Sequence, residues 1–148
     1  MFGILIALLS GMLMSIQGVF NTGVTKQTNI WLSSTFVQFT AFILCFSAWL
    51  LVGRQASFVS LFKTDKKYML LGGVLGAFIT FTVVLGMSYL GPAKATILIV
   101  TAQLMASYLI ELLGWFGTEK VDFQWRKLLG VVFIIAGIII FKWESNQT

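Results

Sequence analysis

The sequence has 148 residues, of which 58% are hydrophobic and only 10% are charged, and its formal net charge is +5. Soluble domains carry about 25% charged residues, so this composition indicates an integral membrane protein with no room for a separate soluble domain. The absence of histidine excludes a histidine-based general base or metal site within one chain, and the positive charges, which lie in loops and near helix ends, indicate membrane topology and not nucleic-acid binding.

The first apolar stretch, residues 2–20, predicts a membrane-spanning helix. We expect this helix to be retained, because it has neither the basic n-region nor the cleavage site of a signal peptide. Small residues recur every four positions along one of its faces, and Gly11 belongs to this row, which predicts close approach by another helix. On a second face, Gln17 and Asn21 are one turn apart and form a polar stripe.

The second predicted span covers residues 31–52 and has a face of small and polar side chains that includes Gln38. The single cysteine, Cys45, falls inside this span and cannot form an intrachain disulfide. The following loop, residues 53–67, is basic, and we expect it to be a positive-inside anchor rather than a phosphate site. Its segment SFVSLF is apolar enough to lie on the membrane surface.

The next apolar region, from Tyr68 to Trp115, is too long for one crossing of a membrane. As a single helix it would extend roughly 72 Å, whereas the hydrocarbon core is about 30 Å thick. Gly91-Pro92 supplies the break, because glycine permits a tight turn and proline suits the first turn of a helix. The sequence therefore predicts two spans, residues 68–90 and 93–115, joined by a hairpin.

Pairs of glycines mark the expected packing faces of the third and fifth spans. Gly72, Gly76 and Thr80 form a GxxxG-type ridge in the third span. Gly130 and Gly137 are one heptad apart in the fifth span, which we place at residues 126–143. This span is short, so its fit to the bilayer depends on flanking aromatic and basic residues.

The fourth span carries the most informative polar pattern. Gln103, Ser107 and Glu111 are spaced i, i+4 and i+8, so they share one face of a helix. A carboxylate inside an apolar span costs at least about 2.5–3.5 kcal/mol, which makes such a residue a candidate for function. We expect Gln103 to make an inward polar contact. Glu111 has two interpretations, a functional role or a side chain that reaches the headgroups near Trp115.

Five spans place the two termini on opposite sides of the membrane. The side of the N-terminus carries seven of the ten Lys and Arg residues and the other side carries three. Under the positive-inside rule, this difference predicts a cytoplasmic N-terminus and an external C-terminus. The two sets are Arg54, Lys63, Lys66, Lys67, Lys120, Arg126 and Lys127, and Lys26, Lys94 and Lys142.

Five segments follow one another along the chain: QGVFN, GGVLGAF, LGPA, AQLMASYLIELLGWFG and RKLLGVVFIIAG. Their order and spacing resemble the YdcZ-like family of the drug/metabolite transporter superfamily, over nearly the whole chain. The resemblance implies an all-α, five-transmembrane-helix half-transporter bundle in the cell membrane. Larger members of the superfamily resemble two such repeats in opposite orientation, so the expected partner is an antiparallel second copy, with dual topology, or an oppositely oriented paralogue.

Together these observations predict a transporter that moves a small organic solute, a metabolite or drug, by alternating access. We expect uncharged polar residues on three helices to line its cavity: Gln17, Asn21, Gln38, Gln103 and Ser107. Small multidrug resistance proteins of the same superfamily use a first-helix glutamate for proton coupling. This first span has Gln17 instead, so Glu111 is the carboxylate within the predicted spans that is left for coupling.

The alternative function is a non-transport membrane subunit that acts in assembly or regulation through its glycine faces. Polar stripes on three helices favour the transporter, because a packing subunit needs small residues more than amides. We see no nucleophile–base pair, so an enzyme is not expected. We also expect no cofactor, no metal and no nucleic-acid partner; the partners are membrane lipid, the small-molecule substrate and the second half of the dimer.

Overall fold

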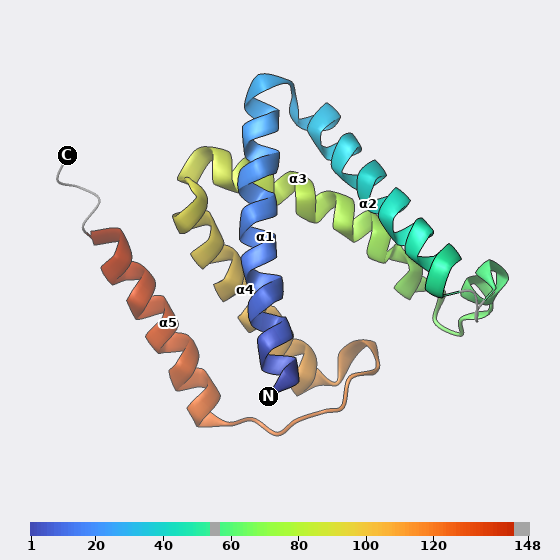
Figure 1. Ribbon diagram of the computed structural model, residues 1–148. Helices are drawn as coiled ribbons and strands as arrows, with labels where there is room; N and C mark the ends of the chain where they lie inside the picture. The colour runs from blue at the N-terminus through green and yellow to red at the C-terminus, as the bar shows by residue number, and fades with distance from the viewer. Residues whose placement is uncertain (54–56, 144–148) are drawn as a thin grey trace. The chain divides into compact units, whose positions relative to one another are not determined.

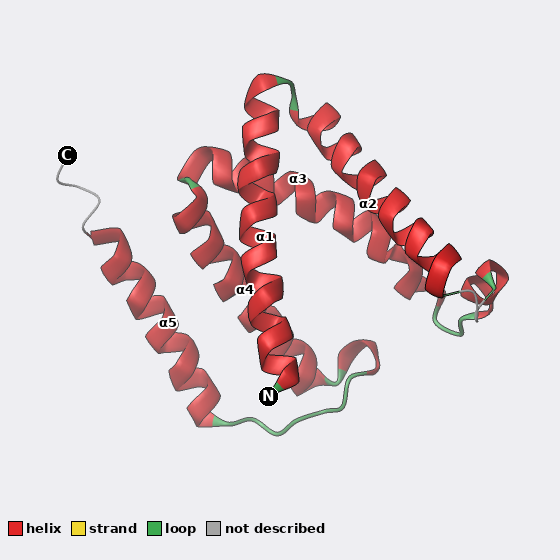
Figure 2. Cartoon of the chain, in the orientation of Figure 1, coloured by secondary structure: helices red, strands yellow, loops and turns green. Residues whose placement is uncertain are grey.

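A computed structural model describes residues 1–53 and 57–143, with the side chains at 138, 139 and 141–143 left aside. Within these residues the chain is helical and contains no β-strand (Figure 2). Short 3-10 segments accompany the α-helices. In chain order (Figure 1), the elements are α1 (Phe2–Gln27), α2 (Ile30–Val52), η1 (Phe58–Lys63), η2 (Lys67–Leu71), α3 (Gly72–Leu90), α4 (Pro92–Leu113), η3 (Trp115–Gly117) and α5 (Trp125–Trp143).

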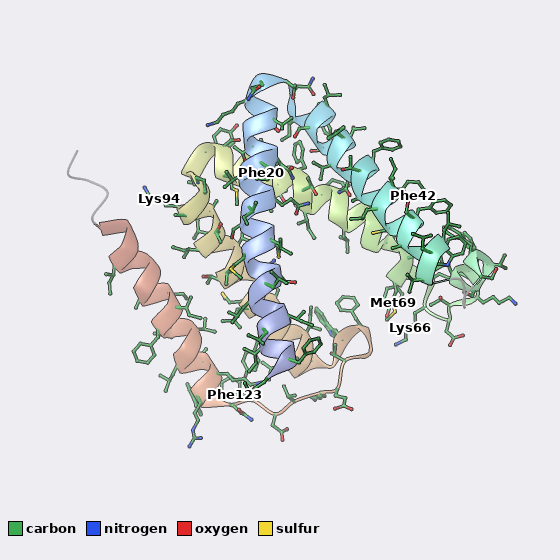
Figure 3. All side chains as sticks on the ribbon, in the orientation of Figure 1. Phe20, Phe42, Lys66, Met69, Lys94 and Phe123 are labelled. Carbon is green, nitrogen blue, oxygen red and sulfur yellow. The ribbon has the colours of Figure 1, made fainter. Side chains whose placement is uncertain are left out.

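Four helical segments of the described chain are long and apolar enough to cross a membrane: α1, α2, Lys67–Leu90 and α4. Their surfaces agree with this, because large apolar side chains such as Phe20 and Phe42 project outward from their helices and are exposed (Figure 3). Such a surface needs lipid or protein around it. All four segments lie where the sequence predicts spans, and α5 lies where it predicts the fifth.

The first helix is longer than the predicted span, since α1 continues beyond residue 20 to Gln27. Asn21 and Thr22 in this extension are buried. The hydroxyl of Thr22 donates a hydrogen bond of 2.8 Å to the carbonyl oxygen of Gly18, one turn back. The polar side chains thus end the apolar stretch without ending the helix.

The chain divides into two units, Met1–Tyr89 and Leu90–Thr148. In the first unit, the Asn29 side chain caps α2 by accepting a 2.8 Å hydrogen bond from the backbone N–H of Leu32. The Ser33 hydroxyl donates a 3.2 Å hydrogen bond to the backbone oxygen of Asn21, which joins the facing ends of α1 and α2. These contacts fix the helical hairpin at its turn.

α3 meets α1 at Gly18. A Cβ atom on Gly18 would lie 2.5 Å from Cε of Met87 and 3.4 Å from a methyl group of Val83. Met87 and its neighbour Val84 are among the buried apolar side chains of the described chain. A side chain at position 18 would therefore displace the end of the Met87 side chain where it crosses α1.

In the second unit, α4 begins as predicted at the Gly91-Pro92 break: Gly91 has a φ of 79° and Pro92 is the first residue of the helix. α4 ends at Gly114, which adopts the left-handed conformation with a φ of 65°. The backbone N–H of Val121 then returns to the carbonyl oxygen of Glu111 at 3.1 Å. This loop leads into α5.

Candidate functional site

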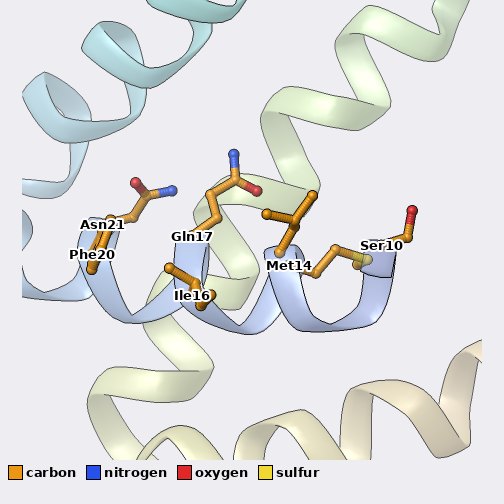
Figure 4. A pocket seen from close by; sticks show the side chains of 7 residues that line it. Ser10, Met14, Ile16, Gln17, Phe20 and Asn21 are labelled. Atoms are coloured by element: carbon orange, nitrogen blue, oxygen red, sulfur yellow. The ribbon is translucent and has the colours of Figure 1, made fainter. Parts of the chain in front are cut away.

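The polar face of α1 is the first of three places where predicted site residues lie. Gln17 and Asn21 project to the same side of the helix (Figure 4) and border a shallow cavity of about 480 Å³. Gln17 is exposed, whereas Asn21 is 8% exposed. The cavity is lined by side chains of α1 alone: Ser10, Leu13, Met14, Ile16, Gln17, Phe20 and Asn21.

Gln38 lies in a second and larger cavity, the groove between α2 and α3, with a volume of about 650 Å³. Its Nε2 donates a 3.1 Å hydrogen bond to Oγ1 of Thr80 on α3. The Thr80 hydroxyl in turn donates a 3.0 Å bond to the carbonyl oxygen of Gly76. This relay orients the amide of Gln38, because a threonine hydroxyl that donates to the backbone is left as an acceptor.

Four of the nine side chains that line the α2–α3 groove are aromatic. Trp31 of α2 stacks on Phe81 of α3 with ring centroids 5.0 Å apart and an interplanar angle of 25°. The Oγ atom of Ser34 is buried and has no hydrogen-bond partner among the described residues. None of the side chains that line the groove is ionisable; they are Trp31, Ser34, Thr35, Gln38, Phe39, Val74, Ala77, Phe78 and Phe81.

The third place is the α4–α5 hairpin, where Nζ of Lys127 lies 3.4 Å from Oε2 of Glu111. The same ammonium lies 5.0 Å from the ring centroid of Tyr108, and the Tyr108 hydroxyl accepts a 3.0 Å hydrogen bond from the backbone N–H of Gln124. Both charged side chains are partly exposed, at 40% and 48%. They border a cavity of about 320 Å³ that Ser107 also lines.

The first two cavities, and the α4 side of the third, belong to helical segments that are long and apolar enough to cross a membrane. A family model described as "Putative inner membrane exporter, YdcZ" matches residues 2–140. The chain belongs to this family. Its membership confirms the resemblance seen in the sequence. Neither the search of curated proteins nor the search of solved structures found a match.

Membership of the YdcZ exporter family, together with the four long apolar helices, makes this chain a multi-pass membrane protein of the transporter class rather than an enzyme. Among the residues that the structure describes, no group of three His, Cys, Asp or Glu side chains is placed to hold a metal ion. Cys45 is a free and exposed thiol.

In this YdcZ-family chain the predicted site residues fall into separate sets. Gln17 and Asn21 share one cavity, and Ser107 and Glu111 share another, as their spacing of four residues predicts. Gln38 lies in the α2–α3 groove. Gln103 is exposed on α4 and lines none of these three cavities.

Sequence reasoning missed the partners that two of these residues use, Thr80 for Gln38 and Lys127 for Glu111. The sequence places Thr80 on the packing ridge of the third span, but no local pattern indicates that this ridge contacts Gln38. In the sequence, Lys127 contributes only to the predicted membrane topology. A cation in the first turn of the fifth span, after a carboxylate in the last turns of the fourth, is the signal for that ion pair.

The five glycines predicted to pack have open faces within the described chain. A Cβ atom on any of them would meet no heavy atom within 4 Å, in contrast to Gly18. Their faces are open, so their predicted contacts would have to come from elsewhere. The open positions are Gly11, Gly72, Gly76, Gly130 and Gly137.

Proposed function

We propose that this protein exports a small organic solute across the cytoplasmic membrane by alternating access, as one half of an inverted dimer. The observation that carries the proposal is Gln38, an amide held by Thr80 at the edge of an aromatic groove between two membrane-spanning helices. Polar side chains inside the membrane are expensive and mark substrate pathways. The family description as an inner membrane exporter supports the same role.

The proposed architecture is a single transmembrane domain of five spans, with α5 as the fifth. α5 has 19 residues, which at 1.5 Å per residue is about 28 Å and is close to the thickness of the hydrocarbon core. An odd number of spans places the termini on opposite sides. The excess of Lys and Arg residues on the side of the N-terminus favours a cytoplasmic N-terminus.

The proposed partner is an antiparallel second copy or an oppositely oriented paralogue. Two observations support a partner: the open glycine faces, which allow close helix contact, and the exposure of the amides Gln17 and Gln103 on apolar helices. An amide that faces lipid loses hydrogen bonds that a facing protein surface can restore. Two halves in opposite orientation would place equivalent sites near the midplane, as inverted repeats do in other transporters.

In this scheme the amides and Ser107 contact the solute, and Glu111 couples transport to protons. The Glu111–Lys127 ion pair supports a role for Glu111 that involves its charge, since the carboxylate is held toward a cation instead of extending alone from the helix. Coupling of this kind requires that protonation of Glu111 weaken its ion pair with Lys127 at the start of α5. Coupling would thus act through the α4–α5 hairpin.

The deciding experiment is a counterflow screen with the protein reconstituted in liposomes. We expect one or more radiolabelled small organic solutes to exchange faster than in empty liposomes. Gln38→Leu and Gln103→Leu should lower the exchange, while Thr82→Val, a change to an exposed threonine that bonds only its own helix, should not. If no solute in a broad panel exchanges above the blank, the alternative of a non-transport subunit replaces this proposal.

A further inference from the structure

The α2–α3 groove has a chemistry that a transport role does not by itself specify. Its volume of about 650 Å³ falls within the range of small-molecule sites, roughly 300–1,000 Å³. Its lining combines four aromatic rings with an amide and two hydroxyl groups, and it contains no ionisable side chain. A site of this kind selects by shape, stacking and neutral hydrogen bonds.

The polar groups of the groove have hydrogen-bonding capacity that the chain does not use. One hydrogen of the Gln38 amide goes to Thr80, and its second hydrogen and its Oε1 have no partner among the described residues. The buried hydroxyl of Ser34 likewise has no partner there. Buried polar groups are nearly always paired, so the buried and unpaired hydroxyl of Ser34, beside the unused hydrogen-bonding groups of the half-buried Gln38, indicates a polar ligand.

The geometry points to a binding site for an uncharged, flat organic molecule that carries an amide, carbonyl or hydroxyl group. This inference rests on the proposed function and names its solute class. The flat part of the solute lies against the aromatic side chains, where ring pairs at 4.5–7 Å are favourable, and its polar group lies at Gln38 and Ser34. The Trp31–Phe81 stack forms one fixed wall.

Charged solutes fit this groove less well. Aromatic faces attract cations, but no carboxylate lines the groove to balance the charge that a cation would bring into an apolar site. An anion meets neither Lys nor Arg in the lining, and the negative faces of the rings repel it. For either ion, the free energy lost with its hydration shell is therefore larger than the free energy gained from contacts in the groove.

The test compares three probes that share a phenyl ring and nearly the same size: benzamide, which is neutral, benzylammonium and benzoate. Saturation-transfer NMR titrations on the protein in nanodiscs, with empty nanodiscs as the blank, give a Kd for each probe. We expect saturable binding of benzamide at least about 10-fold tighter than that of either ion, since 1.4 kcal/mol corresponds to tenfold. Equal or tighter binding of an ion, or no saturable binding of benzamide, overturns the inference.

Variants locate the site. Gln38→Leu and Phe78→Leu should each weaken benzamide binding about 2- to 10-fold, through a lost hydrogen bond and a lost ring contact. Phe36→Leu is the matched control, because Phe36 and Phe78 are both 63% exposed and only Phe78 lines the groove. Equal weakening by Phe36→Leu would place the binding elsewhere. Size-exclusion profiles of the three variants show whether each one folds.

The counterflow screen separates this inference from the proposed function. If other solutes exchange but benzamide does not bind, the groove assignment fails and the transporter stands. If benzamide binds at the groove but no solute crosses the membrane, the groove stands as a binding site and the transporter fails.

Discussion

The hydrogen bond between Gln38 and Thr80 offers the sharpest test of how α2 meets α3. At 3.1 Å it joins two side chains that are 42 residues apart in the sequence. Hydrogen bonds between side chains of membrane helices contribute about 0.6 kcal/mol on average and up to about 1.7 kcal/mol. Both side chains are half-buried, and Thr80 is also engaged with Gly76, so we expect a value near the average.

A double-mutant cycle isolates this energy. The free energy of unfolding in mixed dodecylmaltoside–SDS micelles is measured for the wild type, Gln38→Leu, Thr80→Val and the double variant. We expect a coupling energy of about 0.6 kcal/mol, a factor of about 3 in the equilibrium constant.

Thr82→Val supplies the control for this cycle, because its hydroxyl also bonds to its own helix, at 2.9 Å from the oxygen of Phe78, but has no partner on α2. Thr80→Val and Thr82→Val therefore lose the same kind of backbone bond, and only the first loses a contact with Gln38. A cycle with Thr82 should give a coupling near zero. A Thr80 coupling equal to that control would show that α2 and α3 do not meet in this register.

Two further predictions concern the packing of α1 and the α4–α5 hairpin. Gly18→Val should destabilise the protein by about 1–3 kcal/mol in the same unfolding assay, because the new side chain displaces Met87. Gly23→Val is the control and should destabilise the protein less, since a Cβ atom at Gly23 meets nothing within 4 Å. Equal effects of the two variants would refute the contact between Gly18 and Met87. Glu111→Gln should abolish the pH dependence of solute counterflow while solute binding persists. Lys127→Gln keeps the carboxyl group of Glu111 and should retain a pH dependence. A pH profile of Glu111→Gln that overlays the wild type would show that Glu111 has no role in coupling.

Local patterns were sufficient for the helices. Apolar length identified the crossing segments, and the Gly91-Pro92 pair located the break between α3 and α4, because both signals act within a few residues. The end of α1 was harder to predict. Hydropathy reports where a chain leaves lipid, and Thr22 shows that a helix continues past that point when its polar side chains bond back to the preceding turn.

The sequence predicts which site residues share a face of one helix, but it does not predict which residues they contact on another helix. A spacing of four residues is enough to put Gln17 beside Asn21 and Ser107 beside Glu111, since that is a property of one helix. The hydrogen bond from Gln38 to Thr80 depends on how α2 and α3 are aligned. That alignment results from the summed packing of many side chains, which no local pattern reports.

The alignment of two helices also determines why Gly18, and not Gly11, receives a neighbouring side chain. Both are small residues of α1 and both permit close approach, but two helices that cross at an angle touch closely at one point. Met87 and Val83 meet α1 at Gly18, where Thr22 and Asn21 are also buried one turn later.

Charge is distributed along the described helices in a way that bears on what the protein can carry. Lys26 lies in the last turn of α1, Lys94 in the first turn of α4, Glu111 in the last turns of α4 and Lys127 in the first turn of α5. Between these ends the polar groups are amides and hydroxyls, which lose far less than a charge when they leave water. A neutral solute can pass such groups without placing an uncompensated charge in the membrane. An ion would require a compensating charge at each step, and the lining of the α2–α3 groove supplies none.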